Sequence, residues 1–313
     1  MTAVISASLV KQLRDETGAG MMDCKNALTA ASGDVGAAKT WLREKGLSRA
    51  ASKAGRTTNE GVVELYLDGG TAASRTGVLL ELNCESDFVA RTDQFRNLAR
   101  TLAHEVAVSS SLTTLDELMS GPASSDEGRS VADLVSDAVA ALGENVSVAR
   151  FTRLAIPEGA EGRVDGYVHD ASGSARIGVL LHLSCQSRKA AESEPLSELA
   201  REIALQIAGM APAYISREDV PESLVAAERD IYRKQVEGKP ENIVEKIIAG
   251  KLDSYFAGIC LLDQPWVRDD KRKIADLLAS ASSQLSETVS VGRFFRYQVG
   301  EVGDGTSADQ SQA

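Results

Sequence analysis

The sequence predicts an α+β protein: an N-terminal helical module followed by two copies of one α+β subdomain, the second with an inserted helical hairpin. Three observations predict this fold class. Apolar residues recur at helical spacing in the first 48 residues, residues 60–108 resemble residues 161–209, and residues 131–154 resemble residues 274–297. Each copy is expected to run strand, strand, long helix, helix, strand.

Three short helices are expected in residues 1–48. The first ends at Gly18, because glycine accepts the left-handed backbone that a helix exit often needs. The second ends near Gly33, and the third begins near Asp34 and ends at Gly46. A helical bundle of this size is marginally stable alone and is more often a docking module than an enzyme.

The turn at residues 17–24 is rich in glycine and could in principle cradle a phosphate. The P-loop pattern, however, requires a Lys-Ser/Thr pair after its last glycine, where this chain has Met21 and Met22. We therefore reject nucleotide binding at this turn. Two interpretations of the methionines stay open: they fill the core of the module, or they form a partner-facing patch, since methionine adapts to irregular surfaces.

An internal repeat follows a basic linker of small residues at 49–59. Residues 60–108 align on residues 161–209 without a gap, and 18 of these 49 positions are identical. The second block has an offset of 143 instead of 101 and agrees at 12 of 24 positions. Because two blocks agree in order and content, we interpret residues 60–154 and 155–300 as similar subdomains, each an antiparallel three-stranded sheet covered by helices on one face.

The two offsets differ by 42 residues, so the second copy contains an insertion at about residues 217–258. Apolar residues recur at helical spacing on both sides of a Gly-Lys-Pro turn at 238–240, which predicts an antiparallel helical hairpin. The hairpin either folds back to shield the sheet or protrudes. Because it has little core of its own, we favour an extended contact surface. Residues 301–313 are expected to form a disordered tail.

The segment 83–91 is the most distinctive loop of the first copy. It follows an apolar run at residues 77–82 and precedes a helical pattern, so Asp87 and Phe88 lie on a strand-to-helix turn. Local pattern alone favours a Phe88 that fills its own core. The second copy, however, has Lys189 at the position of Phe88, so the scaffold does not require an aromatic there. The repeat therefore favours a functional role for this loop.

Composition and charge exclude several classes of protein. A formal net charge of −11 at pH 7 argues against a general nucleic-acid binder and against adhesion to anionic membranes. No apolar run approaches the roughly 20 residues of a membrane span, and the N-terminus lacks the features of a signal or transit peptide. The cysteines lie far apart, which predicts reduced thiols in a cytoplasmic protein and no metal site: Cys24, Cys84, Cys185 and Cys260.

No catalytic constellation is evident in the sequence. Neither a Cys-His nor a Ser-His-Asp motif surrounds any of the three histidines, His104, His169 and His182. The GxGxxG, Walker A and HExxH patterns do not occur either. We therefore expect a binding protein that has no catalytic residues and no cofactor.

Several segments together resemble the elongation factor Ts family of bacteria. They are LVKQLR at 9–14, TGAGMMDCK at 17–25, NCESDFVA at 83–90, His169 with ARIGVL at 175–180, and GKP with IVEK at 238–246. The resemblance covers the chain from about residue 4 to 300. It implies an N-terminal module similar to a ubiquitin-associated domain, a two-part core and a coiled-coil arm.

The resemblance also implies a function: exchange of guanine nucleotide on elongation factor Tu, with release of GDP and Mg²⁺ and without covalent chemistry. Residues carried over from the family's motifs would form a wedge near the partner's Mg²⁺: Ser86, Asp87, Phe88 and Val89. Others would dock on the GTPase: Met21, Met22 and His169. The alternative is a translation-associated adaptor or holdase that binds without accelerating exchange. A small-molecule enzyme with a cleft between the copies is a third, disfavoured by the lack of a titratable cluster.

Overall fold

The computed structural model describes residues 5–69, 73–124, 126, 128–171, 173–236 and 240–301. The chain divides into two compact units. The first contains Met1–Glu64, Leu80–Phe151 and Asp170–Arg176, and the second contains Leu65–Leu79, Thr152–His169 and Ile177–Ala313.

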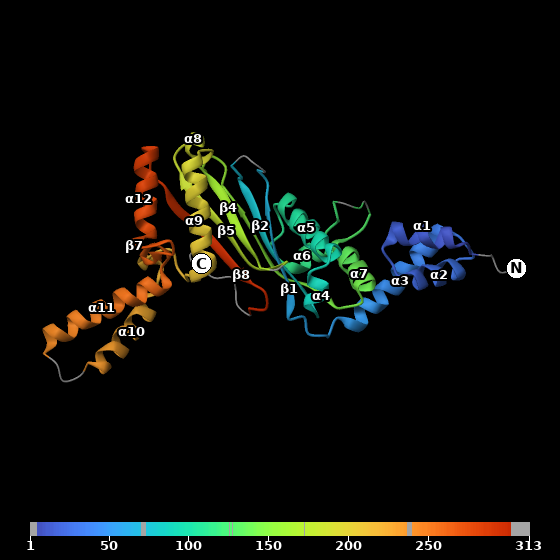
Figure 1. The fold of residues 1–313 in the computed structure, drawn as a ribbon, viewed down its shortest axis with the longest axis horizontal. Coiled ribbons are helices and arrows are strands. Elements are labelled where there is room, and N and C mark those ends of the chain that lie inside the picture. Colours follow the sequence, from blue (N-terminus) through green and yellow to red (C-terminus); the bar gives the residue numbers. More distant parts are fainter. Residues whose placement is uncertain are drawn as a thin grey trace. The chain divides into compact units, whose positions relative to one another are not determined.

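The N-terminal helices are α1 (Ala7–Thr17), α2 (Met21–Ala30) and α3 (Val35–Lys53), labelled in Figure 1. The Ser6 hydroxyl caps α1 by accepting the Leu9 N–H at 3.2 Å, and Gly18 ends it in the left-handed conformation, at φ 67°. Asp34 caps α3 in the same way. The small core of these helices consists of Val10, Leu13, Cys24, Ala27, Leu28 and Ala38.

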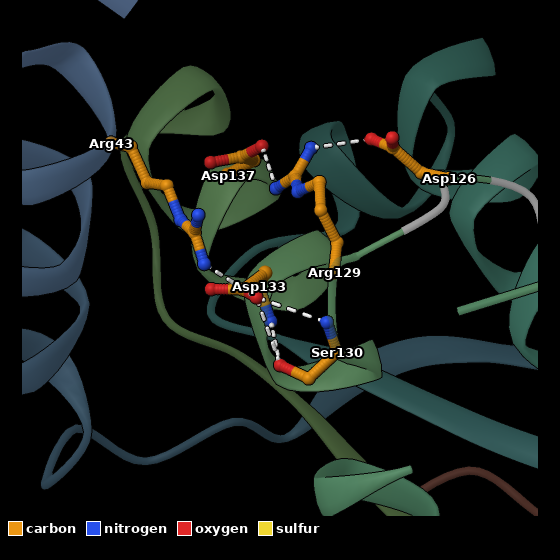
Figure 2. A network of polar contacts seen from close by, with 6 residues as sticks. All are labelled: Arg43, Asp126, Arg129, Ser130, Asp133 and Asp137. Carbon is orange, nitrogen blue, oxygen red and sulfur yellow. Dashed lines mark hydrogen bonds and ion pairs between the residues drawn. The ribbon is translucent and has the colours of Figure 1, made fainter. Parts of the chain in front are cut away.

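The prediction that the third helix ends at Gly46 is wrong, because α3 continues to Lys53 and takes in part of the expected linker. Gly46 lies inside the helix and faces α7 (Val131–Leu142): a Cβ at this position would lie 3.4 Å from that of Ala140, in van der Waals contact. Two polar contacts extend the same seam. Arg43 pairs with Asp133 at 2.8 Å (Figure 2), and Lys53 donates to the Gly143 carbonyl. Gly18 therefore ends its helix, whereas Gly46 lies inside α3, where this helix packs on α7.

The two three-stranded sheets expected from the repeat are confirmed. The first has the order β1-β2-β3, with β1 at Glu60–Leu67, β2 at Thr76–Cys84 and β3 at Val146–Ala155. The second has the order β4-β5-β8, with β4 at Glu161–Ala171, β5 at Ser174–Cys185 and β8 at Ser290–Gln298. Strands β5 and β8 pair antiparallel, with one register shift between His182 and Leu183.

In both copies the helices lie, along the chain, between the second and third strands of the sheet. In the first copy they are α4 (Asp87–Ala90), α5 (Asp93–Val108), α6 (Leu115–Ser120) and α7. In the second they are α8 (Arg188–Ala191), α9 (Glu194–Met210) and α12 (Ile274–Leu285). Alternate residues of β5 form a core with apolar residues of α9: Val179, Leu181 and Leu183 with Leu199, Ile203 and Ile207. A sheet covered by helices is therefore observed in this copy, as expected.

The insertion forms two helices, α10 (Glu222–Gln235) and α11 (Glu241–Ile259), which lie side by side as a hairpin in Figure 1. Its core is thin, because α10 buries no residue fully while α11 buries Val244, Ile248, Leu252 and Phe256. Most of the expected turn at 238–240, and the expected tail beyond Glu301, lie outside the described residues. Before α12 a short hairpin pairs β6 (Pro265–Trp266) with β7 (Asp269–Lys273); the sequence did not predict it.

Candidate functional site

The loop after β2 is built around a helix of a single turn. Ser86 has an extended backbone, and its hydroxyl caps α4 by accepting the Val89 N–H at 3.4 Å. Thr92 closes the other end: its hydroxyl donates to the Val89 carbonyl at 2.8 Å and also caps α5. The first turn of a helix fixes several backbone dihedral angles for a single hydrogen bond, so a helix of four residues is not stable by itself. The conformation of α4 therefore depends on its caps and its surroundings.

This single turn separates a buried side chain from an exposed one. Ala90 is buried, whereas Phe88 is 81% exposed, which excludes the interpretation that Phe88 fills its own core. Val89 is half-buried, and Asp87 pairs with Arg91 at 3.1 Å near the surface. An exposed pair of this kind adds little stability. The loop thus presents an aromatic ring to solvent from a short, capped helix.

A second pair of residues braces the loop from the end of α7. The Glu144 carboxylate accepts two bonds from Ser86, one from the hydroxyl at 2.5 Å and one from the backbone N–H at 2.9 Å. In return, the Glu85 carboxylate accepts the Asn145 N–H at 2.7 Å. The Asn145 side-chain amide donates to the Arg56 carbonyl at 2.9 Å. Neither Glu144 nor Asn145 was predicted from the sequence, although the repeat matches Glu144 with Glu287.

The equivalent loop of the second copy has the same scaffold and a different tip. Ser187 caps α8 by accepting the Ala190 N–H at 3.2 Å, and its hydroxyl bonds Glu287 at 3.2 Å. The exposed residues of this turn are Arg188 and Lys189. The turn therefore forms without an aromatic residue, as the repeat predicted.

Met21 and Met22 begin α2 and point away from its core. Met22 is 66% exposed and Met21 is 46% exposed, while Cys24 and Leu28 of the same helix are buried. Of the two interpretations left open by the sequence, core filling is therefore excluded.

His169 is exposed on β4, where the Tyr167 hydroxyl lies 3.0 Å from its Nδ1. It belongs to the second compact unit, whereas Phe88, Met21 and Met22 belong to the first. The four residues of the α4 loop and the two methionines therefore belong to the first unit, and His169 belongs to the second.

The titratable groups near the loop do not form a nucleophilic centre. Burial, and then the nearby Glu144 carboxylate, raise the pKa of the Cys84 thiol to about 12, so the thiol stays protonated at neutral pH. The hydrogen bond from the Asn145 N–H lowers the pKa of Glu85, which keeps the Glu85 carboxylate ionised. Within the described part of the chain, no group of three or more His, Cys, Asp or Glu side chains could hold a metal ion. No helix there is both long and apolar enough to cross a membrane.

A model of the family described as "Elongation factor TS" matches residues 85–301. The chain belongs to the elongation factor Ts family. Among its relatives is elongation factor Ts of Lawsonia intracellularis, 40% identical over 300 residues that cover 95% of this chain and 99% of the relative. That of Nostoc punctiforme is 39% identical over 302 residues, or 96% and 93% of the two chains. That of Nitratidesulfovibrio vulgaris (strain DP4) is 41% identical over 299 residues, or 95% and 96%.

The elongation factor Ts resemblance inferred from short motifs is therefore confirmed over nearly the whole chain. The motif around Phe88 overlaps the start of the family match at residue 85. Membership of this family makes the chain a protein of translation elongation.

Proposed function

We propose that this chain, as an elongation factor Ts, accelerates release of GDP from elongation factor Tu, and that Phe88 is the group that disturbs the partner's Mg²⁺ site. The single observation that carries the proposal is the 81% exposure of Phe88 on a turn that is capped and braced from below. Burial of an exposed apolar ring by a partner is favourable, and aromatic residues are enriched among the side chains that dominate interface energies.

In the partner, the nucleotide site is where the factor would act. Backbone donors hold the phosphates of GDP, and Mg²⁺ bridges phosphate and protein oxygens. The factor does not need to touch the nucleotide; it needs only to bind better to a form of the GTPase whose Mg²⁺ site is distorted. Burial of the Phe88 ring in that form would stabilise it by about 1.5–3 kcal/mol. No covalent bond is made or broken.

Coupling between the factor and GDP is reciprocal. If the factor weakens GDP binding, GDP weakens binding of the factor by the same ratio, and GTP completes the cycle by mass action. Ser86, Asp87 and Val89 would support the ring at the contact.

The remaining contacts belong to the same proposal. Met21 and Met22 would dock on the GTPase through their exposed thioethers, and His169 would form a separate contact from the second unit. We propose that the helices of residues 1–48 resemble a ubiquitin-associated domain and that α10 and α11 form a coiled-coil arm. The proposed setting is the cytoplasm, with elongation factor Tu as partner and no direct contact with nucleic acid or membrane.

The test is stopped-flow release of fluorescently labelled GDP from elongation factor Tu at rising concentrations of this chain. We expect the release rate to rise and saturate, and added EDTA to reduce the difference, since chelation removes the Mg²⁺ that the factor displaces. Tight binding with an unchanged release rate would instead identify an adaptor or holdase and overturn the exchange proposal.

A further inference from the structure

We propose that Glu144 is a positioning residue of the α4 loop. It sets the direction of the Phe88 side chain by accepting hydrogen bonds from Ser86. This inference rests on the proposed function and deepens it. Glu144 follows Gly143, which ends α7 in the left-handed conformation at φ 77°, and precedes β3. The residue therefore stands at a fixed junction between two elements, 58 positions away in sequence from the residue that it holds.

The geometry of the contact explains how Glu144 controls α4. Its carboxylate takes both Ser86 donors, the hydroxyl at 2.5 Å and the backbone N–H at 2.9 Å. Hydrogen bonds to an ionised acceptor are stronger than neutral ones. Because the hydroxyl proton is committed to Glu144, a lone pair of the same oxygen is left to accept the Val89 N–H. The carboxylate thus orients the cap that begins the single turn carrying Phe88.

Hydrogen bonds run in both directions between residues 85–86 and residues 144–145, so the α4 loop is held against rotation. Glu144 receives the Ser86 N–H, and Glu85 receives the Asn145 N–H at 2.7 Å. Each of the two pairs, Glu85-Ser86 and Glu144-Asn145, therefore supplies a carboxylate that accepts a backbone N–H of the other pair. Arg56 adds a third point, since its carbonyl accepts the Asn145 amide and its guanidinium lies 3.4 Å from Glu85.

The second copy provides an internal comparison. Glu287 is the counterpart of Glu144, and it makes the hydroxyl bond to Ser187 at a longer 3.2 Å. Among the described residues, no bond from the Ser187 N–H to Glu287 occurs, and Gln186 replaces the carboxylate of Glu85. The full brace is thus present in the copy that carries Phe88 and reduced in the copy that carries Lys189.

Without the brace, we expect the α4 loop to lose conformational entropy when it binds the partner, which weakens the contact. Without Glu144, the Ser86 N–H and hydroxyl turn to water and the α4 turn frays, so the partner must order it on contact. We expect Glu144→Ala to lower the second-order rate constant for GDP release about tenfold, an effect on the order of 1.4 kcal/mol. Glu144→Gln keeps one acceptor oxygen and should lose less.

The experiment is a double-mutant cycle on the full chain. GDP release from elongation factor Tu is measured for Glu144→Ala, for Phe88→Ala and for the double variant, with Glu287→Ala as the matched control. If Glu144 acts through Phe88, its removal costs little once the ring is gone, so the two effects are not additive. Glu287→Ala should stay within about twofold of the unmodified chain.

A second readout reports on the ring itself. 4-Fluorophenylalanine at position 88 gives a ¹⁹F signal whose width and shift should change in Glu144→Ala and stay unchanged in Glu287→Ala, without any partner present. Wild-type exchange by Glu144→Ala, additive losses in the cycle, or an unchanged ¹⁹F signal would each overturn the inference. If the unmodified chain fails to accelerate GDP release, the proposed function falls, whereas the ¹⁹F comparison still decides whether Glu144 orders the ring.

Discussion

Replacing Phe88 by alanine is the sharpest perturbation that the structure offers. The ring is 81% exposed, so its removal leaves no cavity in the chain. Surface substitutions of this kind usually change the free energy of unfolding by no more than about 0.5 kcal/mol. We therefore expect an unchanged midpoint of thermal unfolding, and any loss of exchange then belongs to the contact with the partner.

The size of the loss follows from the area that a partner could cover. Complete burial of a phenylalanine side chain is worth about 1.5–3 kcal/mol. Scaled by the exposed fraction of Phe88, the ring can supply about 1.2–2.4 kcal/mol to the distorted form of the GTPase. Since about 1.4 kcal/mol is a factor of ten, the second-order rate constant for GDP release should fall roughly 7- to 50-fold.

The assay is stopped-flow release of labelled GDP, with Lys189→Ala as the matched control. Lys189 occupies the position of Phe88 in the twin turn α8 and is exposed as well, so it tests whether truncation of any exposed tip is enough. The control should exchange within about twofold of the unmodified chain. Unchanged release by Phe88→Ala, or equal losses in both variants, would refute the wedge mechanism.

Three further predictions concern the scaffold. Because burial raises the pKa of Cys84 to about 12, iodoacetamide at pH 8 should label this thiol slowly in the folded chain and rapidly in urea, as read by mass spectrometry. Burial, and then the Arg75 charge, lower the pKa of His182 below its ordinary 6.5. The unfolded chain therefore binds this proton more readily, so the free energy of unfolding should decrease as the pH falls below 6.5. Urea unfolding at pH 7 and pH 5 should show a smaller decrease for His182→Gln than for the unmodified chain. Gly166→Ala should destabilise the fold by about 1–3 kcal/mol, because its Cβ would lie 2.3 Å from the Val179 carbonyl oxygen, whereas Gly250→Ala meets nothing within 4 Å and should stabilise α11 by about 0.5–1 kcal/mol.

Much of the fold was predictable because its signals are periodic. Apolar residues at helical spacing in 95–106 predicted α5, and all six of them are buried: Phe95, Leu98, Ala99, Leu102, Ala103 and Val106. The repeat, read without any structure, predicted two three-stranded sheets and the place of the α10–α11 insertion. The small β6–β7 hairpin was missed, since strands of two and five residues are too short to show alternation.

Sequence by itself determined the architecture of the two copies, the family, and the asymmetry between Phe88 and Lys189 on equivalent turns. Only the tertiary structure decided that Phe88 lies in solvent and that Met21 and Met22 do not fill a core. It alone showed that α3 runs past Gly46, so that Lys53 at its end donates to the Gly143 carbonyl, and that Glu144 holds Ser86. The physical reason is range: periodicity reports on neighbours within a turn or a strand, whereas exposure, close helix packing and a carboxylate 58 residues away depend on what the folded chain brings together.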